Sequence, residues 1–98
     1  MSHPTATCGV TVLNRQGLHA RPAHMLVEAA GRYACEVEVI KGNEAVDGKS
    51  ILSVLTLGAE CGTELTIRAT GPDADEAVRV IAEMFARKFR KEGSSEEE

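Results

Sequence analysis

The sequence predicts an α+β domain in which three helices cover one face of a four-stranded antiparallel sheet. Three observations support this prediction. The chain has 98 residues, enough for one domain with a modest core. Apolar residues alternate with polar ones in four segments, as in half-buried strands, and recur at helical spacing in three others. These segments follow in the order strand, helix, strand, strand, helix, strand, helix. Ferredoxin-like domains share this kind of pattern, so the pattern alone does not separate them.

The first strand is expected to begin at about residue 8, where inward and outward positions alternate. Its inward residues are Cys8, Val10 and Val12. The residues before it, from Met1 to about Ala6, are expected to form a loose leader. The whole chain, residues 1–98, is therefore interpreted as a single domain with an ordered core over about residues 7–91.

A helix is expected from about residue 19 to 32, where apolar residues at helical spacing form a stripe that would face the sheet. Gly31, near its end, is a typical stop signal. The stripe consists of Ala23, Leu26, Val27 and Ala30. His24 lies in this helix five residues after His19, whereas histidine pairs that bind a metal on a helix are usually four apart. We therefore expect His24 to be an exposed neighbour and predict no metal site.

Two short strands joined by a hairpin turn are expected next. They cover about residues 35–41 and 44–46, and the turn contains Gly42 and Asn43. A short helix over about residues 50–57 follows, with Ser50 at the favoured N-cap position.

This short helix has more apolar side chains than two turns can bury. Val54 and Leu57 must face the core, which leaves Ile51, Leu52 and Leu55 to be accommodated. We therefore expect some of these three residues to contact a partner protein.

The last strand and the last helix are expected over about residues 63–69 and 73–90. The strand's inward residues are Leu65, Ile67 and Ala69. The helix has an apolar face made of Ala77, Val80, Ile81, Met84 and Phe85. Basic residues near its end complement the helix dipole: Arg87, Lys88, Arg90 and Lys91. The final segment, residues 92–98, is polar and acidic and is expected to be a disordered tail.

Composition excludes several classes of function. The chain has 11 basic and 15 acidic side chains and few aromatic ones, so it lacks the charge and the stacking surface of a nucleic-acid-binding protein. Its three cysteines are widely spaced and indicate neither a disulfide framework nor a zinc site. No segment approaches the length of a membrane span, so a cytosolic location is expected.

His19 is the candidate functional residue because it lies where a turn becomes a helix. The start of a helix leaves backbone N–H groups without intrahelical partners and carries partial positive charge, which suits an anion. Pro22 fits the first helical turn, Gly17 can adopt backbone conformations that other residues resist, and Arg21 offers donors suited to phosphate oxygens. A neutral imidazole is also a good nucleophile near pH 7. These features predict a histidine that accepts a phosphoryl group.

Two motifs in the same order resemble those of the HPr family, the histidine-containing phosphocarriers of the phosphoenolpyruvate:sugar phosphotransferase system. Residues 14–23 read NRQGLHARPA and contain the histidine motif; residues 48–55 read GKSILSVL and resemble the family's regulatory serine segment. The resemblance runs from about residue 7 to about residue 91. It implies the family's open-faced β-sandwich.

The resemblance also implies a function. Enzyme I, phosphorylated by phosphoenolpyruvate, would pass the group to His19, which would hand it to an enzyme IIA domain or another acceptor, with Arg21 assisting. Ser50 matches the serine that HPr kinase phosphorylates in some members. The protein would then be a monomeric carrier rather than an enzyme with turnover of its own, and it would need no cofactor.

The sequence leaves two other functions open. One is a regulatory or nitrogen-type protein of the same system, in which Ser50 phosphorylation controls binding to a partner such as a transcriptional regulator; the residues before the histidine, Asn14 to Gln16, resemble that branch as well. The other is a small-molecule sensor with a ferredoxin-like fold, but no motif announces the polar pocket that such a sensor needs.

Overall fold

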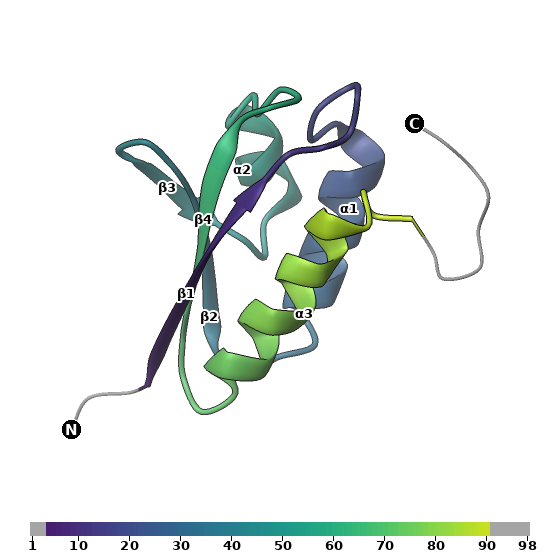
Figure 1. Ribbon diagram of the computed structural model, residues 1–98. Helices are drawn as coiled ribbons and strands as arrows, with labels where there is room; N and C mark the ends of the chain where they lie inside the picture. The colour runs from purple at the N-terminus through teal and green to yellow at the C-terminus, as the bar shows by residue number, and fades with distance from the viewer. Residues whose placement is uncertain (1–3, 91–98) are drawn as a thin grey trace.

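The computed structural model describes residues 4–90 and contains all seven expected elements (Figure 1). In chain order they are β1 (Thr5–Thr11), α1 (Ala20–Ala30), β2 (Glu36–Lys41), β3 (Glu44–Asp47), α2 (Ile51–Thr56), β4 (Glu64–Thr70) and α3 (Ala74–Ala86). The predicted α+β order of strands and helices is confirmed.

The four strands form one antiparallel sheet in the order β1-β4-β2-β3. In the middle of the sheet, Ile67 of β4 lies between Cys8 of β1 and Val39 of β2. One residue along, the outward-facing Arg68 of β4 pairs with Glu38 of β2, and the Arg68 Nε donates a 2.8 Å hydrogen bond to the carboxylate. Opposite faces of the sheet are therefore apolar and polar, as the alternation predicted.

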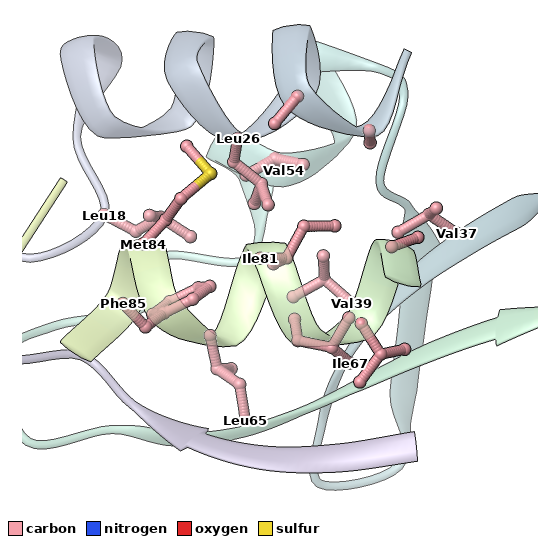
Figure 2. Close-up of a cluster of buried hydrophobic side chains, with 14 of the residues drawn as sticks. Leu18, Leu26, Val37, Val39, Val54, Leu65, Ile67, Ile81, Met84 and Phe85 are labelled. Carbon is pink, nitrogen blue, oxygen red and sulfur yellow. The ribbon is translucent and has the colours of Figure 1, made fainter. Parts of the chain in front are cut away.

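The helices lie on the apolar face of the sheet and leave the other face open (Figure 1). Figure 2 shows the core between the two layers, with Leu26 from α1, Val54 from α2, Ile81 and Phe85 from α3 and Ile67 from β4. The inward residues expected from the strand and helix patterns are mostly buried, although Cys8, Val10, Val27 and Val80 are only partly covered.

The expected loose leader is wrong where the structure describes it. β1 begins at Thr5 rather than near Cys8, and Thr5 and Ala6 pair with Thr70 and Ala69 of β4. The Gly71 N–H also donates a 2.9 Å hydrogen bond to the Pro4 carbonyl. The strand extends because β4 runs on to Thr70 and offers backbone partners to Thr5 and Ala6.

The last helix is shorter than expected, because α3 ends at Ala86 and not near residue 90. The chain leaves it through a Schellman-type turn: Phe89 N–H bonds to Met84 C=O at 2.8 Å, and Lys88 N–H bonds to Phe85 C=O at 3.1 Å. The Phe89 ring packs edge-on against Phe85 with a centroid distance of 4.8 Å. Burial of Phe89 thus pulls the chain out of the helix. Of the expected basic residues, Arg87, Lys88 and Arg90 lie in or after this turn rather than in the last helical turn, and Lys91 lies outside the described residues.

The other boundaries differ from the expected ones by only one or two residues. α1 ends at Ala30 before the expected Gly31, but Gly31 has φ −68° and so keeps a right-handed conformation. The predicted hairpin turn at Gly42 and Asn43 is confirmed, with Gly42 at φ 59°. The expected acidic tail, residues 92–98, lies outside the described residues. Over residues 4–90, no helix is long and apolar enough to cross a bilayer.

Candidate functional site

His19 occupies the N-cap position of α1. Its backbone is extended, with φ −84° and ψ −168°, and its carbonyl accepts a 2.9 Å hydrogen bond from the Ala23 N–H. The imidazole makes no capping hydrogen bond to the helix and is partly exposed. The backbone of His19 therefore starts the helix, while its ring remains at the helix entrance, where the helix dipole is positive.

A tight turn directly before His19 holds it in place. The Gly17 N–H donates to the Asn14 carbonyl at 2.9 Å, and Gly17 has φ 78°. A Cβ atom at this glycine would lie 2.6 Å from the Ala59 carbonyl oxygen, so no larger residue fits without movement of the backbone. The expectation that Gly17 serves a special backbone conformation is confirmed.

The loop over residues 59–63 supports this turn from the other side. Leu18 N–H donates to the Ala59 carbonyl at 2.8 Å, and the Leu18 side chain is buried in the core (Figure 2). Val12 also exchanges backbone hydrogen bonds with this loop, to Thr63 at 2.9 Å and from Gly62 at 2.7 Å. Two segments far apart in the sequence thus fix the backbone on which His19 is presented.

Two further residues of the histidine motif lie in the first turn of α1. Pro22 is buried, and Arg21 is exposed two residues after His19. Because the first-turn N–H groups have no intrahelical partner, the missing N–H of Pro22 costs no helical hydrogen bond. His24 is exposed on the same helix, as expected.

Ser50 is the N-cap of α2, as expected. Its Oγ accepts a 3.3 Å hydrogen bond from the Ser53 N–H, and the residue is partly exposed. The preceding Lys49 is held in place, since its Nζ donates a 2.8 Å hydrogen bond to the Tyr33 carbonyl. The hydroxyl of Ser50 is thus a structural cap that also reaches the surface.

An apolar patch follows Ser50 on the surface of α2. Ile51, Leu52 and Leu55 are 39%, 70% and 36% exposed, while Val54 and Leu57 of the same segment are buried. The prediction that this helix cannot hide all of its apolar side chains is confirmed. α2 packs beside α1, so the patch belongs to the same helical layer as His19 (Figure 1).

Sequence reasoning missed the structural role of Asn14. This side chain is fully buried, and its Nδ2 donates a 2.8 Å hydrogen bond to the Lys88 carbonyl in the turn after α3. No periodicity signals such a contact, because its two partners are 74 residues apart in the chain.

Within residues 4–90, no group of three or more histidine, cysteine or acidic side chains could hold a metal ion. Cys8, Cys35 and Cys61 are free thiols. Burial and, to a lesser extent, a hydrogen bond to Asp73 raise the pKa of the Cys35 thiol, which keeps the thiol protonated.

Comparisons with known proteins agree on one family. Residues 6–87 match the family model "PTS HPr component phosphorylation site". The chain is 41% identical over 83 residues to a phosphocarrier protein HPr of Treponema pallidum, covering 85% of this chain and 94% of that protein.

Solved structures give the same result. The crystal structure of HPr-C-His from Thermoanaerobacter tengcongensis superimposes with a TM-score of 0.83 at 32% identity, covering 86% of this chain and 94% of that one. The Bacillus subtilis catabolite repression protein Crh, described as a dimer with a swapped domain, superimposes with a TM-score of 0.70 at 34% identity and covers 84% and 94% of the two chains.

Proposed function

Because the chain belongs to the HPr family of phosphocarrier proteins of the bacterial phosphotransferase system, with that family's open-faced β-sandwich, we propose that His19 is the residue that carries the phosphoryl group. The observation that supports this assignment most directly is the position of the imidazole. It lies at the N-terminus of α1, partly exposed and not used to cap the helix. Phosphoryl oxygens on this ring would lie near backbone amides at the positive end of the helix dipole.

The proposed reaction needs little from the carrier besides placement and charge. The Nδ1 lone pair of neutral His19 attacks the phosphorus carried by a histidine nitrogen of enzyme I. The new N–P bond forms as the old one breaks, and the donor nitrogen keeps the electron pair of the broken bond. Arg21, exposed in the first turn, would stabilise the transferred oxygens. Transfer to an enzyme IIA domain would repeat the same step in the opposite role.

Ser50 and the apolar patch on α2 are proposed to control docking. Enzyme I and enzyme IIA domains would bind Ile51, Leu52 and Leu55, which are exposed next to Ser50. A phosphate on Ser50, added by an HPr kinase/phosphorylase, would place about two negative charges at the edge of this apolar patch. It would reduce transfer and could create a binding site for a transcriptional regulator.

The proposed carrier function is tested by labelling. The protein is incubated with enzyme I and ³²P-phosphoenolpyruvate, and the stability of the label in acid is measured. A phosphohistidine is labile in acid, whereas a phosphoserine survives. His19→Ala should abolish labelling, and His24→Ala, which alters an exposed histidine on the same helix, should retain it. Labelling that persists in His19→Ala would contradict the proposal.

The alternative regulatory function is favoured by one observation, the exposure of the patch beside Ser50. If the protein acts mainly in this way, labelling from enzyme I should be slow, while phosphorylation of Ser50 should change its affinity for a regulator.

We further propose that the carrier is a monomer in solution, unlike the swapped dimer described for Crh. Its molar mass, measured by size-exclusion chromatography coupled to light scattering, should be that of one chain.

A further inference from the structure

Asn14 is the only polar side chain that is fully buried among residues 4–90. It connects two distant parts of the molecule. Its carbonyl accepts the hydrogen bond from Gly17 that closes the turn before His19, and its side-chain Nδ2 donates to the carbonyl of Lys88. The turn before His19 is thus tied to the turn that ends α3.

Both ends of this connection are locally unfavourable. Asn14 Oδ1 is buried and has no hydrogen-bond donor within the described residues, which leaves half of the amide unsatisfied. Lys88 and Phe89 have φ 57° and 59°, a left-handed conformation that non-glycine residues avoid. An apolar side chain of similar size at position 14 would bury no unsatisfied oxygen, but it would leave the Lys88 carbonyl without the Nδ2 donor. Local rules are broken in this way mainly at functional sites.

We propose that Asn14 is a positioning residue for phosphoryl transfer at His19, acting through the turn that it shares with Gly17. This inference rests on the proposed function of His19. The route is short, because Asn14 holds Gly17, and Gly17 and Leu18 are the two residues before His19. The Lys88 carbonyl holds Asn14 in turn, so the end of α3 fixes the start of α1.

The connection matters because in-line transfer is sensitive to placement. The His19 nitrogen must meet phosphorus along the line of the breaking bond, and a misplacement of about 1 Å can cost up to about 100-fold in rate. Without the Asn14 amide, Gly17 keeps its contact with Ala59, but the residues before it lose their link to α3. The turn before His19 then keeps its backbone hydrogen bond from Gly17 to Asn14 and its support from the 59–63 loop, but it is no longer anchored to the end of α3.

The test compares variants in a quench-flow assay of transfer from phosphorylated enzyme I. Asn14→Ala should transfer about tenfold more slowly than wild type at a temperature where both are fully folded. The matched control is Ile67→Val or Ile67→Ala, whichever has the melting temperature nearer to that of Asn14→Ala; Ile67 is buried in β4 and pairs with Cys8 and Val39.

A second readout separates positioning from loss of stability. The ³¹P chemical shift of phosphorylated His19 and the half-life of the phosphohistidine should change in Asn14→Ala but not in the Ile67 control. If Asn14→Ala does not fold, wild type still provides a test. Phosphorylation of His19 should shift the side-chain amide resonances of Asn14 and the backbone amide of Phe89 more than the backbone amide of Arg68 on the open face.

The outcomes are distinct. Transfer to Asn14→Ala within twofold of the Ile67 control, with an unchanged ³¹P shift, would overturn the role of Asn14 and leave the carrier function intact. Equal shifts at Asn14, Phe89 and Arg68 on phosphorylation would overturn it as well. No transfer to wild-type His19 would instead refute the proposed function on which this inference rests.

Discussion

At the scale of single residues, Gly17 is the position where the site tolerates least change. It has φ 78°, and a Cβ atom there would lie 2.6 Å from a backbone carbonyl oxygen. Backbone carbonyls cannot rotate away as flexible side chains can, so the turn or the 59–63 loop must move to accept any side chain. This close approach explains why a glycine precedes the histidine by two residues.

Gly17→Ala should therefore lower the free energy of unfolding by about 2 kcal/mol or more, from left-handed strain of about 1–2 kcal/mol plus the clash. Urea denaturation followed by circular dichroism measures this loss. The matched control is Gly42→Ala. Gly42 has φ 59°, but no atom lies within 4 Å of an added Cβ, so this variant should lose stability through backbone strain alone. Equal losses in the two variants would show that the contact with Ala59 is unimportant.

Asp73 gives a pH-dependent prediction. Hydrogen bonds to its carboxylate, first from the Ala34 N–H and also from Cys35, lower the pKa of Asp73 from its ordinary value of 3.8. A lowered pKa means that the folded state favours the charged carboxylate. The stabilisation is therefore fully present above pH 3.8, the value expected when unfolded, and is lost as the pH falls through the folded value.

Asp73→Ala should accordingly be less stable than wild type at pH 7, and the difference between them should shrink in acid below about pH 3. Thermal unfolding at both pH values measures it. Asp75→Ala, at an exposed residue in the first turn of the same helix, is the control and should show a smaller change with pH. A difference for Asp73→Ala that stays constant down to pH 2 would contradict this account.

At the scale of elements, the start of α2 has two features side by side: the residue that caps the helix and an exposed apolar patch. Ser50 caps the helix through the Ser53 N–H, and the apolar patch begins at the next residue. A change at Ser50 thus acts both on the helix and on the surface. A substitution without charge is expected to act mainly on the stability of the helix, and one that adds charge mainly on the surface.

Ser50→Ala should lower stability by about 1 kcal/mol through loss of the cap, with little effect on enzyme I affinity. Ser50→Asp should keep the cap but weaken enzyme I binding, because the charge must be desolvated beside an apolar patch. Isothermal titration calorimetry measures the affinity. Thr7→Asp, which adds the same charge at an exposed position of β1 on the open face of the sheet, is the control. Unchanged affinity of Ser50→Asp would refute the docking role of this helix end.

At the scale of the whole molecule, the two faces of the sheet have different expected roles. The helical layer carries His19, Ser50 and the apolar patch, and the open face carries polar strand residues such as Thr7 and the Arg68–Glu38 pair (Figure 1). In the proposed function, one layer would therefore provide both the reactive residue and the surface for partners. Changes on the open face would then be expected to leave transfer unaffected.

Leu52→Glu should weaken enzyme I binding by about tenfold or more, because it puts a charge at the most exposed of the three patch residues. Its stability should remain within about 0.5 kcal/mol of wild type, since the side chain is 70% exposed. Thr7→Glu should leave transfer unchanged. A loss of transfer in Thr7→Glu as large as in Leu52→Glu would show that partners also use the open face.

The sequence alone was sufficient for the features that depend on neighbouring residues. The strand alternation, the start of α1 at His19, the Ser50 cap and the surplus of apolar residues on α2 each involve contacts within a few positions, so local patterns predicted them. Local patterns, together with the family resemblance, also predict His19, Arg21 and Ser50 as site residues.

The tertiary structure decided the features that join distant residues. β1 begins at Thr5 because β4 offers backbone partners there, and α3 ends at Ala86 because Phe89 is buried against Phe85. The same holds for Asn14, whose amide meets a carbonyl 74 residues away. Such contacts exist only once the sheet and helices have packed, since no local spacing encodes which backbone groups will then face each other.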